Sequence, residues 1–120
     1  QDSCAFYERQ AIHNHFSGVV EETEEGDRIA NALGDKTVLF MQNHGILSTG
    51  PSIDIALWYY FSLERCCQSQ LMADAAGKTT LIPHETAIKT REFIANDLAA
   101  WASFQPLFDM ISQREPDLLD

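Results

Sequence analysis

Basic residues are scarce in this sequence. Its 120 residues include 8 Lys and Arg against 18 Asp and Glu, so the formal net charge is −10. No segment gathers basic side chains into a patch that would neutralise phosphates, which argues against nucleic acid or an anionic membrane as a partner. The apolar runs also fall short of the ~20 residues that a spanning helix needs. We therefore expect no nucleic-acid partner and no membrane partner.

The sequence also lacks an even set of cysteines and an initiator Met. Of its three cysteines, Cys66 and Cys67 are adjacent in a predicted helix, where both cannot face one partner. This argues against a disulfide framework and favours a cytoplasmic location. Because the sequence starts without Met, the chain is expected to be part of a longer product, and the start at Gln1 has neither the basic nor the apolar region that would direct membrane insertion. Length and composition predict a single domain over residues 1–120.

Turn residues and apolar patterns predict alternating strands and helices. Residues 16–20 are expected to form a short strand, and the acidic residues that follow begin a helix ending near Leu33, with Gly34 as its stop. Residues 37–42 and 46–49 read as two strands joined by a tight turn at Asn43-His44-Gly45. Residues 4–13 are compatible with either a short helix or a loop.

The second half of the sequence is predicted to be helical. Ser52 can cap a long amphipathic helix that ends before Gly77, and aromatic residues widen its apolar surface beyond one stripe. Its stripe is predicted from residues that recur at spacings of three and four: Ala56, Tyr60, Leu63, Cys67 and Leu71. Two of its faces are therefore expected to be buried, one against a sheet and one against another layer or subunit. A helical tail follows from about residue 78, with one helix from 84 to 100 or beyond, a break or kink at Pro106 and a short helix over 107–113.

Several segments in this order resemble the class II aldolase/adducin family. They are Gly34-Asp35-Lys36, Gln42-Asn43-His44-Gly45-Ile46-Leu47, Thr49-Gly50, Leu63-Glu64-Arg65, Gln68 and Gln70-Leu71. The resemblance covers residues 1–76, and more loosely Phe104-Gln105-Pro106. It implies an α/β fold in α/β/α layers with a largely antiparallel sheet, assembled as a homo-oligomer. On this reading, the chain is the C-terminal portion of such a domain with a helical tail.

The resemblance also implies a role for His44. Catalytic members hold a divalent metal, commonly zinc, with three histidines, and the third of these aligns with His44. Such a metal accepts the negative charge that develops when a carbon–carbon bond breaks next to a carbonyl group. The family's other two ligands form a His-x-His pair upstream, and its acid/base carboxylate lies further upstream, so all three would fall before Gln1. One imidazole does not make a zinc site, and the chain is expected to be catalytically incomplete in this form.

The other polar clusters have ordinary structural interpretations. His13-Asn14-His15 has the spacing of a chelating pair, but its position differs from that of the family's pair, so we interpret it as a surface or interface feature. The acidic run at 21–25 is interpreted as a solvated helix start. The aromatic residues at 58–60 are expected in packing, Cys66 and Cys67 are not expected to be nucleophiles, and His84 is assigned no role.

Two functional hypotheses follow. The first is a metal-dependent lyase or epimerase that acts on a small hydroxy-carbonyl or sugar-phosphate compound, with His44 as a metal ligand and the remaining ligands on another segment. The second is a non-catalytic assembly, storage or adducin-like interaction protein that keeps the packing of the fold without its chemistry. Identification of a His-x-His pair beside His44 would distinguish them.

Overall fold

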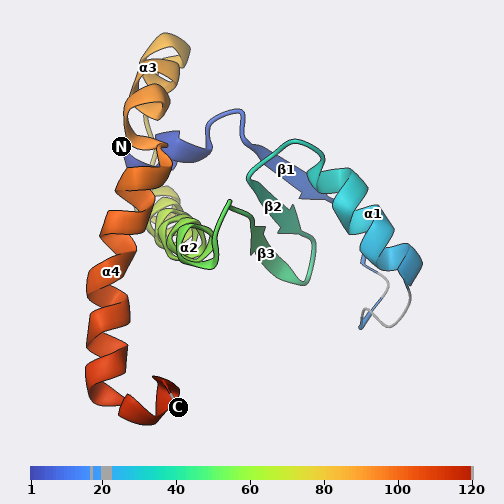
Figure 1. Cartoon of the computed structure of the whole chain (residues 1–120). Coiled ribbons are helices and arrows are strands. Elements are labelled where there is room, and N and C mark those ends of the chain that lie inside the picture. Colours follow the sequence, from blue (N-terminus) through green and yellow to red (C-terminus); the bar gives the residue numbers. More distant parts are fainter. Residues whose placement is uncertain (17, 20–22, 120) are drawn as a thin grey trace.

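The computed structural model describes residues 1–16, 18–19 and 23–119, and it has a mixed α/β fold, as predicted. Within these residues, no helix combines the length and apolar character needed to cross a membrane. Figure 1 labels the main elements. In chain order they are η1 (Asp2–Phe6), β1 (Gln10–His13), α1 (Thr23–Leu33), β2 (Val38–Met41), β3 (Gly45–Ser48), α2 (Ile53–Ala76), α3 (His84–Ile94), α4 (Asp97–Arg114) and η2 (Pro116–Leu119).

The described strands form one sheet in the order β1-β2-β3. β2 and β3 pair antiparallel, with Val38 opposite Ser48 and Met41 opposite Gly45, which confirms the predicted hairpin. β1 pairs with β2 in parallel, with Gln10 opposite Val38 and His13 opposite Met41. A parallel pair needs a crossover connection, and α1 provides it.

Both faces of the sheet are covered at its centre. Val38 and Leu39 are neighbours in β2, so their side chains point to opposite faces, and each is 0% exposed. Val38 packs in a cluster with Phe6 of η1 and with Tyr59 of α2. α1 contacts β1 and β2. The sheet therefore lies between helical layers, as the resemblance implied.

The long helix α2 has the bounds that the sequence predicted, but its buried stripe differs. The buried residues are Ile55, Tyr59 and Leu63, whereas the predicted stripe members Tyr60 and Leu71 are 39% and 71% exposed. Leu63 is buried as predicted, whereas Ile55 and Tyr59 lie one residue earlier than the predicted Ala56 and Tyr60. Its start is held against the hairpin because the hydroxyl of Ser48 donates to the carbonyl of Ala56 at 2.8 Å.

Gly50 allows this close approach of β3 and α2. A Cβ atom at this position would lie 2.9 Å from the backbone nitrogen of Ala56, closer than real Cβ contacts come. The Thr-Gly dipeptide after the hairpin is therefore a packing requirement. It sets where the long helix begins relative to the hairpin tip.

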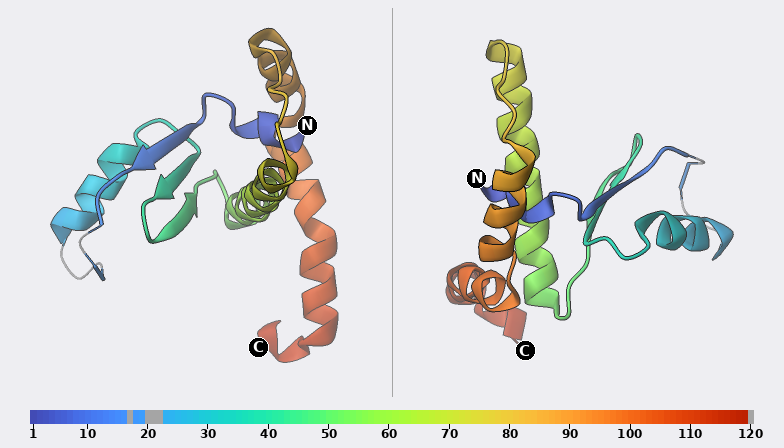
Figure 2. Two further views of the ribbon diagram at one scale, coloured as in Figure 1. Left: turned by 180° about the vertical axis from the view of Figure 1, so that it is seen from behind. Right: turned by 90° about the horizontal axis from the view of Figure 1, so that it is seen from above.

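In the helical tail, α3 contacts η1 and α4 crosses α2 (Figure 2). α3 is held by Tyr7, whose hydroxyl lies 2.8 Å from Nδ1 of His84 and whose carbonyl accepts from Arg91 at 2.9 Å. The predicted break at Pro106 is wrong, because α4 continues through that residue. The chain breaks earlier, at Ala95–Asn96, where Oδ1 of Asn96 accepts from the N–H of Ala99 at 2.8 Å and caps α4.

The predicted strand over residues 16–20 is also wrong where it can be compared. Phe16, Gly18 and Val19 are not in a strand, and Val19 is 82% exposed, while residues 17 and 20 lie outside the described part. The strand is instead β1, in the segment that the sequence left undecided. It forms there because its end packs against α1 through a buried polar pair. The expected helix start at Glu21 and Glu22 also lies outside the described residues.

Candidate functional site

The candidate site lies at one edge of the sheet. His13, at the end of β1, pairs with Met41, at the end of β2, and Met41 pairs with Gly45, at the start of β3. The last residue of β1 and the tip of the hairpin therefore share an edge. Side chains from segments that are thirty residues apart in the sequence meet there.

His44 occupies the tip of the hairpin, as predicted. Asn43 has φ +56° and Gly45 has φ +139°, so residues that tolerate left-handed backbone flank it on both sides. The N–H of His44 donates to the carbonyl of Met41 at 3.1 Å and closes the turn. The imidazole is exposed, so the turn presents it to solvent instead of burying it in the core.

His13 is buried, which corrects its interpretation as a surface residue. It is 8% exposed, and its Nε2 lies 3.3 Å from Oε1 of Glu25 in the first turn of α1. Nε of Arg28 donates to the other oxygen of that carboxylate at 2.7 Å. Glu25 is itself 5% exposed, so the solvated-face interpretation fails for it, although the adjacent Glu24 is exposed as expected.

A small cavity connects these groups. Its volume is about 10 Å³, and its lining includes His13, His15, Glu25 and His44. A cavity of this size holds roughly one water-sized group. Three of the four histidines and one buried carboxylate thus line the same small cavity. The sequence contained a clue that was not used, because Glu25, Arg28 and Ile29 follow helical spacing and place Glu25 on the packed side of α1.

These residues do not by themselves make a metal centre. Across the described ranges, no group of three His, Cys, Asp or Glu side chains is arranged to hold an ion. Nε2 of His13 is occupied by its contact with Glu25, and His15 and His44 are exposed. A catalytic zinc site takes three protein ligands and leaves a position open for substrate. The described residues therefore present an exposed imidazole at the hairpin tip, His44, beside the buried pair of His13 and Glu25.

The cysteines lie away from this edge, and their chemistry agrees with the sequence prediction. All three are free thiols. Burial raises the pKa of Cys66 above its ordinary value, and the negative charge of Asp2 raises it further. Burial and the carboxylate of Glu64 likewise raise the pKa of Cys67. A raised pKa keeps these thiols protonated at neutral pH, so they are poor nucleophiles.

The hairpin, the Thr-Gly contact and the layered sheet define a class II aldolase-type fold. The chain belongs to the class II aldolase and adducin family: residues 1–71 match the family model described as "Class II Aldolase and Adducin N-terminal domain". Among curated proteins it is similar to the decarboxylase NovR of Streptomyces niveus, with 39% identity over 98% of this chain.

Two solved structures share both the fold and recognisable sequence. One is L-fuculose 1-phosphate aldolase from Glaciozyma antarctica PI12, with TM-score 0.81, 35% identity and 97% of this chain covered. The other is an aldolase II superfamily protein from Pseudomonas syringae, with TM-score 0.84, 30% identity and 100% covered. This chain spans 44% of NovR and 43% and 49% of the two structures, less than half of each protein.

Proposed function

We propose that this chain forms part of a metal-dependent lyase of the class II aldolase type, in which His44 supplies one ligand to a divalent metal. Zinc is the preferred ion, since an imidazole suits it. The substrate class is a small hydroxy-carbonyl or sugar-phosphate compound. The observation that carries the proposal is the exposed imidazole at the tip of a rigid hairpin, beside a buried His–Glu pair.

The names of the relatives support this class of reaction. An aldolase and a decarboxylase both break a carbon–carbon bond next to a carbonyl group, and both leave an electron pair on carbon. A bound metal supplies a Lewis acid that stabilises the resulting oxyanion. This chain's own contribution is to hold His44 in position through the turn and the Ser48–Ala56 contact. As it stands, the 120-residue form is proposed to be catalytically incomplete, with assembly as a homo-oligomer in the completed form.

Imidazole NMR of this chain during a zinc titration tests the ligand assignment directly. The resonances of His44 are expected to shift first among the four histidines, because His13 contacts Glu25, His84 contacts the hydroxyl of Tyr7, and the ring of His15 packs on that of His13. His44→Ala should abolish the first response. His84→Ala, far from the site, is the matched control and should leave that response unchanged. If zinc affects all four histidines equally, or binds as well after His44→Ala, His44 is not a ligand.

The second candidate function is a non-catalytic assembly or interaction protein of the adducin type. One observation favours it: the chain is 32% identical to alpha-adducin of Rattus norvegicus over 61% of its length. The two candidate functions predict different behaviour for a domain that also includes the part of the relatives that this chain does not span. A lyase would then hold about one equivalent of metal and lose it on His44→Ala, whereas an interaction protein would assemble without metal.

A further inference from the structure

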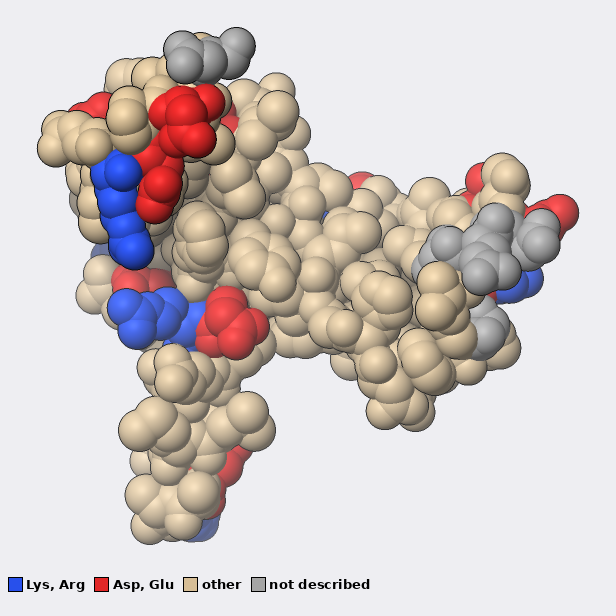
Figure 3. Space-filling model, turned by 90° about the horizontal axis from the view of Figure 1, so that it is seen from below, with Lys and Arg blue, Asp and Glu red and all other residues tan. Residues whose placement is uncertain are grey.

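Most charged side chains of this protein lie on its surface. On the face seen in Figure 3, Lys, Arg, Asp and Glu lie toward the extremities of the molecule. Glu25 differs from these surface charges, because only 5% of the residue is exposed. Nε of Arg28 and Nε2 of His13 contact its two oxygens, at 2.7 and 3.3 Å. Burial of a carboxylate is costly even with such partners, so its position calls for a physical explanation.

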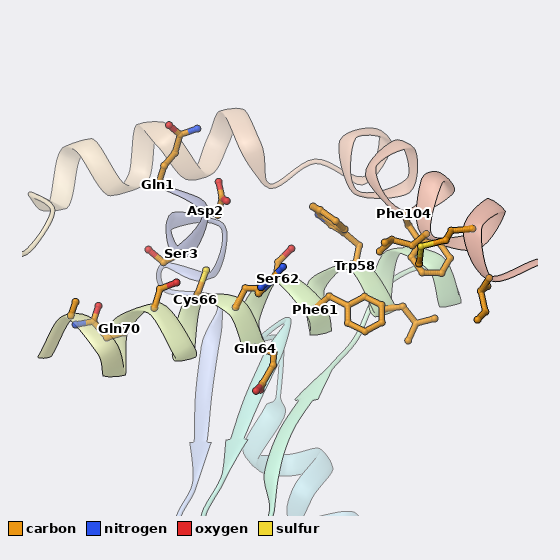
Figure 4. A pocket seen from close by; sticks show the side chains of 17 residues that line it. Gln1, Asp2, Ser3, Trp58, Phe61, Ser62, Glu64, Cys66, Gln70 and Phe104 are labelled. Atoms are coloured by element: carbon orange, nitrogen blue, oxygen red, sulfur yellow. The ribbon is translucent and has the colours of Figure 1, made fainter. Parts of the chain in front are cut away.

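The histidines gather at the small cavity that Glu25 lines, and not at the larger groove of the molecule. The groove lies between α2, α4 and η1 (Figure 4), and among the described residues its lining includes no histidine. Apolar and polar side chains share that groove. The small cavity has His13, His15 and His44 in its lining together with Glu25. It is therefore the more polar of the two.

The size and the lining of this small cavity suit one water molecule. Its volume is about 10 Å³, at the lower end of the ~10–15 Å³ that a buried water occupies. A buried water also needs about two to four polar partners, and the three imidazoles and the carboxylate can supply them. Ile29 and Met41 complete the wall with apolar groups. A site of this kind holds a water in a fixed place.

A histidine that binds a metal uses one ring nitrogen and donates a hydrogen bond from the other. The acceptor of that hydrogen bond fixes the tautomer and the orientation of the ring. Within an imidazole side chain, Nδ1 lies next to the backbone and Nε2 lies at the far end of the ring. At the exposed tip of the hairpin, Nε2 of His44 is therefore the better placed to meet an ion, and Nδ1–H needs an acceptor on the protein side.

We infer that one ordered water in the small cavity accepts a hydrogen bond from Nδ1–H of His44 and donates one to the carboxylate of Glu25. Glu25 is then a positioning residue, which acts through the water on the tautomer of His44. This tautomer leaves the lone pair of Nε2 available to a metal. The consequence for metal binding rests on the proposed function, whereas the chain of hydrogen bonds itself does not.

The test is to record ¹⁵N NMR spectra of the imidazoles in the metal-free chain at about pH 8, where histidine side chains are ordinarily neutral. His44 is expected to carry its proton on Nδ1, whereas an exposed imidazole without such an acceptor favours Nε2. Glu25→Ala should move that proton to Nε2. Glu25→Gln keeps an acceptor oxygen and should restore most of the Nδ1–H form. Glu24→Ala, at the exposed neighbour, is the matched control and should change nothing.

A second measurement uses the unaltered chain, because Glu25→Ala also removes a buried partner of His13. Overhauser effects between water and the methyl groups of Ile29 and Met41 should have the sign of a bound water instead of surface hydration. Both residues line the cavity, so they report on its occupant.

Four results would overturn the inference. They are an Nε2–H tautomer of His44 in the unaltered chain, an equal response to Glu24→Ala and Glu25→Ala, a response of His15 in place of His44, and the lack of a bound-water signal. No metal is present in these measurements. A chain that fails to bind zinc through His44 would thus contradict the proposed function and leave the water-mediated contact with Glu25 intact.

Discussion

His13 and Glu25 form a buried pair that joins the end of β1 to the first turn of α1, with Nε2 of His13 3.3 Å from Oε1 of Glu25. His13 and Glu25 line the same small cavity as His44. Both side chains of the pair are nearly inaccessible to solvent, whereas the imidazole of His44 is exposed. His15, two residues further along, contacts His13 ring to ring, with centroids 6.2 Å apart.

Replacing Glu25 should destabilise the fold. Glu25→Ala leaves the buried ring of His13 and the guanidinium of Arg28 without their acceptor, so the free energy of unfolding should fall by about 1–3 kcal/mol. Urea unfolding followed by circular dichroism measures it. Glu24→Ala, the exposed neighbour, is the control and should change stability by less than about 0.5 kcal/mol. Equal effects of the two substitutions would show that the pair contributes nothing.

The hairpin tip makes a second prediction. Gly45 has φ +139°, so Gly45→Ala forces a side chain into a conformation that costs about 1–3 kcal/mol. Gly26 lies inside α1 with open space around it, and Gly26→Ala should instead stabilise by up to about 1 kcal/mol. Thermal unfolding of both variants should give melting temperatures that move in opposite directions. A Gly45→Ala protein as stable as the parent would contradict the turn geometry.

The cap at Asn96 makes a third. Its side chain satisfies the N–H of Ala99 at the start of α4, so Asn96→Ala should cost about 1 kcal/mol. Hydrogen exchange at residues 97–100 should quicken in the variant. Asn31→Ala, on the exposed side of α1 and away from any helix start, is the control and should leave that exchange rate unaltered.

Thiol reactivity makes a fourth. Burial holds the pKa of Cys66 and Cys67 above the ordinary thiol value, so both should react with iodoacetamide more slowly than free cysteine at pH 8. Unfolding in urea should restore the ordinary rate. Because the folded state favours the protonated thiols, their contribution to stability is complete below the ordinary thiol pKa and is lost as the pH rises through the raised value. Reaction as fast as that of free cysteine in the folded protein would refute the burial effect.

Much of the fold could be predicted from local patterns. The hairpin and the long helix have strong local signatures in Asn43-His44-Gly45 and in the segment from Ser52 to Gly77. β1 has no such local signature. Its four residues are stabilised by parallel pairing with β2, which is distant in sequence, and by the contact between His13 and Glu25. The break predicted at Pro106 was wrong for a related reason. Packing of α4 on α2 offsets the hydrogen bond that proline removes.

The site was only partly predictable. His44 could be located from its turn and from the family resemblance, and the structure places it at the hairpin tip. The contact between His13 and Glu25 could not be predicted, because it depends on how α1 packs against the end of β1. The resemblance places the family's other ligands outside these 120 residues, so only the role of His44 could be addressed here.

The burial of Val38 and Leu39 has a consequence for how this fold diversifies. The two residues fix the centre of the sheet from both sides, only a few positions from the exposed tip of the hairpin. Substitutions of the exposed His44 side chain should therefore change the stability of the scaffold little, whereas truncation of Val38 or Leu39 at its centre should destabilise it strongly. Because the exposed tip and the buried centre are separate, proteins with this fold can differ in chemistry at the tip while they keep the same core. This agrees with the presence of an aldolase and a decarboxylase among the relatives of this chain.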